Sequence, residues 1–477
     1  MKKRLMLIHP PGRVFQRSEE RCQSNIDQST STSLRACNDL GYCAAVMREK
    51  GWDIFLKDYP AENLKEKDFF HDLINFSPDA ILLTTTTPTF FDDLYYVEKI
   101  RQKCPLIYII MKGAVFFDPP EKLLQNRQLS MADILIAEEA ECVIDQILSG
   151  IPREKIPRIF FKDEDKKWVK SVSGYLEENL DRLPFPARDL MNNALYLRPD
   201  TGEVQATIST SRGCPSSCTF CLTPVMTGKK VRFRSPENIV AEIKECVEKY
   251  NIRNFFFRAD TFTINPKLTE KLCDLLEKEN LGRKIKWVAN SRVDTLNETL
   301  LKKMKANGCW LLAIGFESGS QDTLNRIKKR ITVSQMMETA ELIRKAKIKL
   351  FGFFMIGFPW ETEKHLQETR ECIRKIKPDF LELHIATPFY GTELYKQITA
   401  ERGISEDIAG HDYFDNTISC TNSVISAEYI ACFRKKILLH YHFSFRYLFA
   451  RFTECMTDYR KFLSYLRFAV RLIRNLF

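Results

Sequence analysis

Apolar residues follow two alternating patterns along this chain: short continuous runs, and longer stretches in which they recur at helical spacing. Within residues 1–150, continuous runs predict buried strands at 5–8, 54–56, 80–83, 107–110 and 134–136, with helices between them. Strands that alternate with helices form parallel sheets with helices on both faces. The pattern therefore predicts a Rossmann-like, doubly wound α/β domain, whose ligands bind beyond the carboxyl ends of its strands.

The same alternation returns in residues 201–400, after a stretch at 151–200 that we interpret as a connector. The connector contains a charged turn at 162–167 and then prolines, which favour an extended backbone. Beyond it, six strands are predicted at about 205–209, 255–258, 285–289, 311–315, 350–356 and 381–386, with helices between them. In such strand–helix repeats, active-site residues gather at the carboxyl ends of the strands.

Residues 401–477 form a third region, helical in pattern and different in charge. From Ile430 to Phe477 there are ten Lys or Arg residues and two acidic ones, so this tail supplies eight of the net charge of +10. Its basic residues are interleaved with aromatic ones, which favours a basic amphipathic tail in contact with an anionic membrane surface. A helical tail packed against the preceding domain is the alternative. The remaining chain is nearly balanced in charge, so no nucleic-acid partner is expected.

Composition indicates an intracellular enzyme of several domains. The 477 residues are 44% hydrophobic and 28% charged, enough for large cores. Fifteen cysteines are scattered without a small-domain disulfide framework, which suits a reducing cytosol. The apolar part of the amino terminus is too short for a signal peptide, and no uncharged run is long enough to span a membrane. We expect a cytoplasmic protein, with peripheral contact to the inner face of the membrane through its tail.

One short segment carries the most specific chemistry. Cys214, Cys218 and Cys221 form a C-x3-C-x2-C array just after an apolar run. Three thiolates on one loop can hold three irons of a cubic iron–sulfur cluster, which leaves the fourth iron open to a small ligand. A zinc knuckle is the alternative, but it needs a second ligand pair, and none lies within about fifty residues on either side.

Further motifs follow this array in a fixed order. They include the aromatic residue before the third cysteine and the segments at 257–263, 289–294, 315–320, 352–359 and 387–395. From about Val204 to Tyr395 the chain resembles the radical SAM superfamily. That resemblance implies a partial (β/α)6 barrel in which S-adenosylmethionine chelates the open iron of a 4Fe–4S cluster. One electron, from a donor such as flavodoxin or ferredoxin, then cleaves the sulfonium to a 5′-deoxyadenosyl radical.

The resemblance also assigns roles to individual residues. The contacts that it implies for S-adenosylmethionine are Phe220 to the adenine, Glu317 to the amino group, Ser291 or Arg292 to the carboxylate or ribose, Asp260 to the cofactor or the substrate, and Gly357 and Pro359 to a backbone approach to the adenine. For Glu317 and Arg292 the alternative is a buried ion pair without ligand contact. For the glycines it is tight packing.

The strand ends of the first domain carry a second resemblance. They are similar to the cobalamin-binding domain that precedes the barrel in one radical SAM class, through Thr84, Thr85, Thr86, Gly113 and Glu139. The loops around Gly113 and Glu139 depart from the family pattern. No D-x-H-x-x-G motif is present, so no histidine of that motif can bind cobalt. The resemblance implies cobalamin as a cofactor, and a domain kept for architecture or substrate contact is the alternative.

Together these observations predict a radical SAM enzyme that uses cobalamin to methylate a small or lipid-like substrate, or to form carbon–carbon bonds or rings in it. The lipid-like option rests only on the basic tail. A tRNA-modifying enzyme is an alternative, although it would need a second cluster domain or an appended RNA-binding barrel. A non-catalytic electron-transfer module is another, but it leaves Phe220 and Glu317 unexplained.

Overall fold

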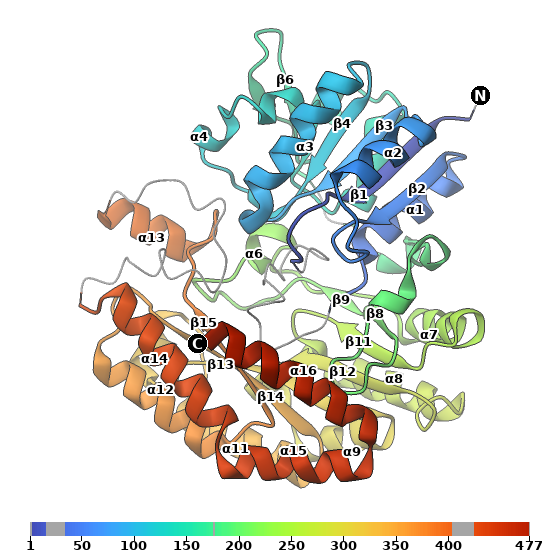
Figure 1. Ribbon diagram of the computed structural model, residues 1–477. Helices are drawn as coiled ribbons and strands as arrows, with labels where there is room; N and C mark the ends of the chain where they lie inside the picture. Colours follow the sequence, from blue (N-terminus) through green and yellow to red (C-terminus); the bar gives the residue numbers. More distant parts are fainter. Residues whose placement is uncertain (1, 16–33, 175–176, 403–423, 477) are drawn as a thin grey trace.

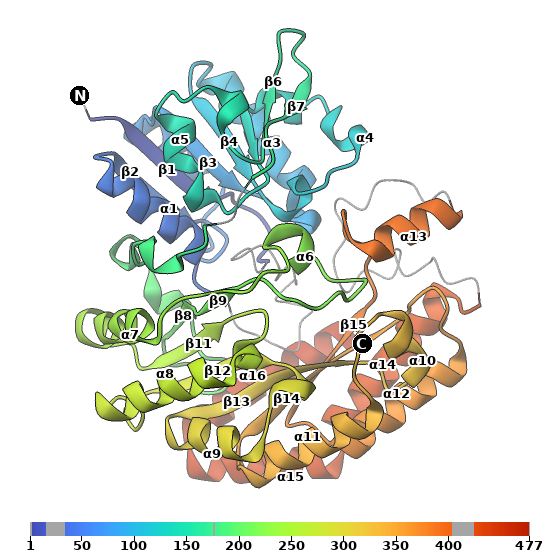
Figure 2. The ribbon, with the colours of Figure 1, turned by 180° about the vertical axis from the view of Figure 1, so that it is seen from behind.

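The computed structural model describes residues 2–15, 34–174, 177–402 and 424–476, and the fold is built from two α/β bodies. Figure 1 shows the amino-terminal body above the second one, with helix α6 (Thr223–Met226) between them. The carboxyl-terminal helices lie on the near side of the second body in this view. Figure 2 shows the same arrangement from behind.

The first body contains a seven-stranded sheet in the order β2-β1-β3-β4-β5-β6-β7. Its strands are β1 (Arg4–His9), β2 (Asp53–Asp58), β3 (Ala80–Thr84), β4 (Tyr108–Lys112), β5 (Ile134–Ile136), β6 (Ile159–Lys162) and β7 (Trp168–Lys170). Its helices are α1 (Asn38–Glu49), α2 (Glu66–Phe76), α3 (Phe90–Lys103), α4 (Glu121–Leu124) and α5 (Ile144–Leu148). The first five strands are parallel, which confirms the doubly wound prediction. The strand order reverses between β1 and β3, so the ligand crevice of such a sheet lies beyond their ends.

The stretch interpreted as a connector contributes to this sheet. Strands β6 and β7 extend it as an antiparallel pair, joined by the charged turn. Further along the same stretch, Arg188 is fully buried and donates to Glu242 of the second body at 2.6 Å. Tyr196 is also buried and donates to Asp58 at the end of β2. The later part of the stretch, around Arg188 and Tyr196, therefore packs between the two bodies.

The second body is built on six parallel strands in the order β8-β11-β12-β13-β14-β15. These are β8 (Gln205–Ser209), β11 (Asn254–Arg258), β12 (Lys286–Ser291), β13 (Cys309–Glu317), β14 (Lys349–Ile356) and β15 (Phe380–Ile385). The helices between and after them are α7 (Pro236–Tyr250), α8 (Pro266–Lys278), α9 (Glu298–Ala306), α10 (Gln321–Arg326), α11 (Val333–Lys345), α12 (Glu363–Ile376) and α13 (Glu393–Arg402). Each strand lies beside its predecessor, and β8 does not pair with β15, so the barrel is open, as predicted.

Local sequence signals fix the ends of these helices. At the start of α7, the Ser235 side chain accepts a hydrogen bond from the Asn238 amide, and Pro236 occupies the first helical position. Asn251 ends the helix in the left-handed region, at φ 53°. The apolar face between these ends, including Ile239 and Ile243, enters the core around the barrel sheet.

Three helices complete the chain: α14 (Ala427–His442), α15 (Phe445–Thr457) and α16 (Tyr459–Leu476). Helix α14 runs along β15, and α15 and the start of α16 contact the amino ends of the barrel strands. Lys349, the first residue of β14, pairs with Glu454 of α15 at 2.6 Å, and Arg460 of α16 pairs with Glu203, just before β8, at 3.1 Å. Among the described residues, no helix combines the length and apolar character needed to cross a membrane. The earlier part of the predicted tail region, residues 403–423, lies outside the described residues.

Candidate active site

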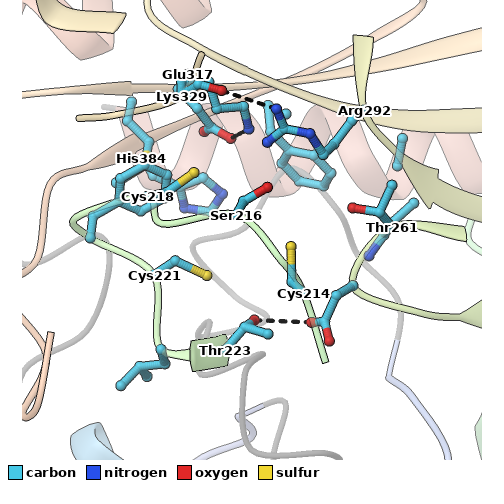
Figure 3. A pocket seen from close by; sticks show the side chains of 18 of the residues that line it. Cys214, Ser216, Cys218, Cys221, Thr223, Thr261, Arg292, Glu317, Lys329 and His384 are labelled. Carbon is cyan, nitrogen blue, oxygen red and sulfur yellow. Dashed lines mark hydrogen bonds and ion pairs between the residues drawn. The ribbon is translucent and has the colours of Figure 1, made fainter. Parts of the chain in front are cut away.

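The three cysteines lie on one loop at the carboxyl end of β8. A short antiparallel pair, β9 (Ser211–Arg212) and β10 (Arg232–Phe233), closes the base of this loop. Cys214, Cys218 and Cys221 are free thiols and partly buried. Figure 3 shows their sulfur atoms directed toward a common space between them. The loop therefore presents three thiols to one cavity, as a cluster with three protein ligands requires.

Hydrogen bonds hold the cysteine loop in shape. Asp260, just after β11, accepts from the Gly213 amide and from the Thr223 hydroxyl, both at 2.9 Å, so it ties both sides of the loop together. At Gly213, φ is +93° and a Cβ atom would stand 2.2 Å from the Lys230 carbonyl oxygen, so only glycine fits. Asp260 was predicted to lie near the cofactor or the substrate. Asp260 lines the cavity that the three thiols face, and it also anchors the cysteine loop through these two hydrogen bonds.

The loop forms one wall of a pocket of about 330 Å³ at the carboxyl ends of the barrel strands. This volume lies within the range of small-molecule sites. The predicted residues that line the pocket are Cys214, Cys218, Phe220, Cys221, Asp260, Ser291, Arg292 and Glu317. Gly357 and Pro359 are not among its lining residues. Most of the predicted site is thus brought together on one cavity.

Glu317 ends β13 with φ +66°, and its carboxylate faces the pocket. Lys329 donates to its Oε1 atom at 2.6 Å, and both side chains are buried (Figure 3). Burial alone would lower the pKa of Lys329, but the Glu317 carboxylate and the Cys218 thiol together raise it. The ion pair that we considered as the alternative for Glu317 therefore exists, on a residue that also borders the cavity.

Arg292 follows β12 and points toward the same space (Figure 3). Its guanidinium binds Asp294 through two nitrogens, at 2.9 and 3.0 Å, and donates to the Lys329 carbonyl oxygen. Burial would lower the pKa of Arg292, but Asp294 and the nearby thiols of the cysteine loop raise it. Arg292 thus keeps its charge beside the cysteines. The neighbouring Ser291 hydroxyl is buried in a hydroxyl cluster with Thr263 and Thr295.

Phe220 contacts the loop that follows β14. Its ring centroid lies 6.0 Å from that of Phe358, which is between Gly357 and Pro359. The buried Glu361 carboxylate accepts from the amides of Gly357, at 2.7 Å, and Phe358, at 3.2 Å, and so fixes the conformation of this loop. Burial raises the pKa of Glu361 to about 7, against the effect of these hydrogen bonds. The loop that contains Gly357 thus packs against Phe220 through Phe358, and Gly357 itself does not line the cavity.

The strand ends of the first sheet face the barrel, and their side chains bind one another. The hydroxyls of Thr85 and Thr89 both donate to the buried Asp93 carboxylate, at 2.8 and 2.6 Å. Thr84 and Thr86 are buried beside them. Gly113 lies against Thr85, where a Cβ atom would stand 2.5 Å from the Thr85 carbonyl oxygen. The threonine run and Gly113 therefore form one closely packed edge at the strand ends.

Glu139, the other residue predicted for cobalamin, joins the two bodies. It binds Arg212 at 2.6 Å and Arg232 at 2.6 Å, and these arginines are the residues of β9 and β10 that pair at the base of the cysteine loop. Burial would raise the pKa of Glu139, but the two arginines lower it to about 2. Glu141 adds a second carboxylate to Arg212. Glu139 is thus engaged in holding the base of the cysteine loop.

The thiols are not gathered as ligands of a single ion. Across residues 2–15, 34–174, 177–402 and 424–476, no group of three or more His, Cys, Asp or Glu side chains is close enough to hold one metal ion. A cubic cluster does not require such a group, because each cysteine binds a different iron. The three thiols on the pocket wall fit the cluster chemistry that the sequence predicts.

Three residues near the pocket escaped the sequence analysis. Lys329 lies in a short basic run after α10, which carries no sign of burial, and Glu361 closes the segment that begins at Gly357. His384 lies on β15 and lines the pocket, and burial lowers its pKa to about 3, so it is neutral near pH 7. Only the position of His384 near a strand end hints at its location.

Fold and site together define an α/β enzyme whose open barrel carries a three-cysteine loop at the rim of its pocket. The family model of the radical SAM superfamily matches residues 208–373. An uncharacterized methyltransferase of Pyrococcus horikoshii is 32% identical over 366 residues, which cover 76% of this chain and 78% of the relative. This chain belongs to the radical SAM superfamily.

Two more distant proteins are also similar to this chain, one in sequence and one in structure. The anaerobic magnesium-protoporphyrin IX monomethyl ester cyclase of Rubrivivax gelatinosus is 24% identical over 370 residues, which cover 75% of this chain and 65% of the cyclase. The radical S-adenosylmethionine methyltransferase TsrM of Kitasatospora setae, solved with cobalamin and a 4Fe–4S cluster, superposes with a TM-score of 0.66 at 14% identity. That likeness covers 84% of this chain and 76% of TsrM, and it shows that the two proteins share a fold that includes both bodies.

Proposed function

We propose that this radical SAM enzyme is of the methyltransferase or cyclase type. Cys214, Cys218 and Cys221 would hold the 4Fe–4S cluster, and S-adenosylmethionine would occupy the adjoining 330 Å³ pocket. When bound, the cluster and S-adenosylmethionine would supply a one-electron reductive cleavage to methionine and a 5′-deoxyadenosyl radical, which becomes 5′-deoxyadenosine by taking a hydrogen atom. The observation that carries the proposal is the convergence of three free thiols and the Glu317 carboxylate on one cavity at the strand ends.

The residues of this chain position the reactants and limit the access of water. Glu317 offers a carboxylate oxygen toward an ammonium group, and Arg292 offers a permanent positive charge toward a carboxylate. Phe220 provides an aromatic surface backed by Phe358. Burial of these groups strengthens their electrostatic interactions with a ligand. Their spacing along one wall suits the amino acid and adenine ends of S-adenosylmethionine.

Cobalamin is the second cofactor that we propose, bound at the edge of residues 1–150 that faces the barrel of residues 201–400. Two observations support it: the fold shared with TsrM, and the packed threonine edge with its close approach of Gly113 to Thr85. Thr84, Thr85 and Thr86 would hold the cofactor with Gly113. Glu139 would act indirectly, because its carboxylate is already bound by two arginines.

The substrate that we propose is a small or lipid-like molecule, methylated or joined at carbon. Its side of the pocket includes Phe353, Met355 and Phe389, together with the neutral His384. A lipid-like substrate was predicted from the tail, but α15 and the start of α16 contact the amino ends of the strands, away from the pocket. The support for an apolar substrate therefore comes from the pocket lining. Flavodoxin or ferredoxin remains the proposed electron donor.

Anaerobic reconstitution tests this function. With dithionite and S-adenosylmethionine, the loaded protein should release 5′-deoxyadenosine, and protein purified from cobalamin-replete cells should show corrinoid absorption. The triple variant Cys214→Ala, Cys218→Ala, Cys221→Ala should bind no cluster and release no product. Its control is Cys104→Ala, Cys432→Ala, Cys455→Ala, which removes thiols outside the pocket and should retain both properties. Product release by the first variant would overturn the cluster assignment, and colourless protein would overturn the cobalamin proposal.

A further inference from the structure

Helices α15 and α16 present apolar side chains to solvent along their outer faces. On α15 these are Phe445, Leu448, Phe449, Phe452 and Met456, and on α16 they are Phe462, Leu463, Leu466, Val470 and Ile473. The spacing repeats every three or four residues, so each set forms one stripe along its helix. Ten exposed large apolar residues lie within residues 445–473, whereas the rest of the described chain exposes nine. Such a concentration marks an interaction surface.

Some polar side chains of these helices, unlike the apolar stripes, point into the protein. Arg451 is 8% exposed and binds Glu454 at 2.8 Å and Asp379, just before β15, at 3.6 Å. Tyr465 of α16 donates to the same Glu454 at 2.6 Å. Phe445, by contrast, is 84% exposed and Phe452 is 62% exposed. A helix that serves only as a cover for the barrel would turn its apolar side inward, so this arrangement requires an apolar environment outside.

The charge around the two stripes selects the occupant. Residues 430–477 contain ten basic and two acidic side chains, and Lys436, Arg446, Arg460 and Arg467 are exposed. A second copy of this chain would bring two regions of net charge +8 together, which opposes self-association. An anionic phospholipid surface offers the complementary charge together with an apolar layer just beneath the headgroups.

We propose that α15 and α16 bind the surface of an anionic membrane, with both helices parallel to the bilayer plane. The 18 residues of α16 extend about 27 Å at 1.5 Å per residue, so the contact is long and flat. The phenylalanine and leucine side chains enter the boundary between headgroups and acyl chains, and the arginines bind lipid phosphates. Because α15 also contacts the amino ends of the barrel strands, the pocket at their carboxyl ends faces away from the membrane.

Vesicle flotation with the full-length, anaerobically purified protein tests the proposal. The protein should float with vesicles of phosphatidylcholine and phosphatidylglycerol, should bind phosphatidylcholine alone at least ~10-fold more weakly, and should be released by high salt. The variant Phe445→Ser, Phe449→Ser, Phe452→Ser should lose at least ~10-fold in partition. These three side chains are exposed, so circular dichroism and thermal unfolding should remain as in the wild type.

The matched control is Ile74→Ser, Leu106→Ser, Val172→Ser, which removes three exposed apolar side chains elsewhere and should leave flotation unchanged. Equal flotation of the phenylalanine variant and the wild type would overturn the proposal. The proposal would also be overturned if the protein did not float with vesicles and its particle mass in solution doubled as the protein concentration rose. The surface would then be a dimer interface. The cysteine-to-alanine variant of the cluster loop should float normally, which separates this inference from the proposed function.

Discussion

The two sheets turn the carboxyl ends of their strands toward each other, yet they use charged residues at these ends in opposite ways. At the ends of the first sheet, the charges satisfy one another: Lys112 donates to Asp39 at 2.6 Å, and Glu139 binds two arginines. At the barrel ends, Glu317 and Arg292 are also paired, but their side chains border a cavity of about 330 Å³.

The difference shows that ion pairs at one strand edge hold parts of the chain together, whereas ion pairs at the other edge border a ligand cavity. A buried charge is stable only with a partner, so every charge at either edge needs one. Where the partners leave only a small cavity of about 50 Å³, as around Glu139, the charges join two parts of the chain. Where a cavity remains beside the pair, as at Glu317, a ligand with a similar charge can share or replace the partner. Substitutions at the two edges should therefore have different consequences.

The largest effect is expected from Glu139→Gln, which removes the carboxylate between Arg212 and Arg232. Loss of one partner from a buried ion pair costs about 3–5 kcal/mol, so the free energy of unfolding should fall by that amount. The low pKa of Glu139 adds a pH signature. Wild-type stabilisation by this carboxylate is complete above about pH 4.5 and is lost as the pH falls toward 2. Urea unfolding at several pH values should show this loss in the wild type and not in the variant.

The control for this experiment is a surface ion pair to the cysteine loop. Glu178 pairs with Lys230 at the surface, and both side chains are exposed, so Glu178→Gln should unfold like the wild type. Because Arg212 and Arg232 close the base of the cysteine loop, Glu139→Gln should also retain less iron after reconstitution. Normal stability and full iron content in Glu139→Gln would show that the first body does not support the cluster loop.

The strands of both sheets could be predicted because they are continuous apolar runs. Leu5 to Ile8 and Leu350 to Ile356 have few polar residues to suggest another structure, and the order of strands and helices gives the topology. The cysteine loop could also be predicted, because the spacing of its three cysteines is local in sequence. The strands β6 and β7 were missed because they are short and flank a charged turn, so their apolar signal is weak.

The partners of charged residues could not be predicted, because they are distant in the sequence. Glu139 and Arg232 are 93 positions apart, and no local pattern links them. Lys329 lies in a basic run that is typical of an exposed loop, yet its side chain is buried against Glu317. The direction of the apolar faces of α15 and α16 was left open between a membrane surface and the barrel, because helical spacing gives the width of an apolar stripe and not its direction.

A second test concerns Glu361, which supports the loop behind Phe220 without facing the cavity. Its pKa of about 7 lies above the ordinary value of 4.5, so the folded protein binds the proton more tightly than the unfolded chain. Stability therefore decreases as the pH rises from 4.5 to 7, by about 3 kcal/mol at ~1.4 kcal/mol per pKa unit. Glu361→Gln keeps an oxygen for the Gly357 and Phe358 amides and removes this dependence.

The variant should match the wild type near pH 4.5 and exceed it in stability at pH 8, as measured by urea unfolding of the cluster-free protein. Glu371→Gln, on the exposed side of α12, is the control and should retain the slope of the wild type. A steep slope that persists in Glu361→Gln would show that another group titrates in this range, and that the loop behind Phe220 is held in a different way.

The smallest measured change is expected at the cavity itself, in the reduction potential of the cluster in Lys329→Met. Burial raises the pKa of Cys218, and the Lys329 ammonium partly opposes this, so its charge favours the thiolate that would bind iron. The same charge favours addition of an electron to a nearby cluster. Its removal should therefore lower the reduction potential by tens of millivolts, where ~59 mV corresponds to ~1.4 kcal/mol for one electron. Redox titration of the reconstituted protein, followed by electron paramagnetic resonance, measures this shift.

Lys329→Arg should restore the potential, and Lys328→Met should leave it unchanged, because Lys328 pairs with Glu393 at the surface. Equal shifts in Lys328→Met and Lys329→Met would mean that the cluster senses only overall charge, and the contrast between the two edges would then not extend to the cofactor.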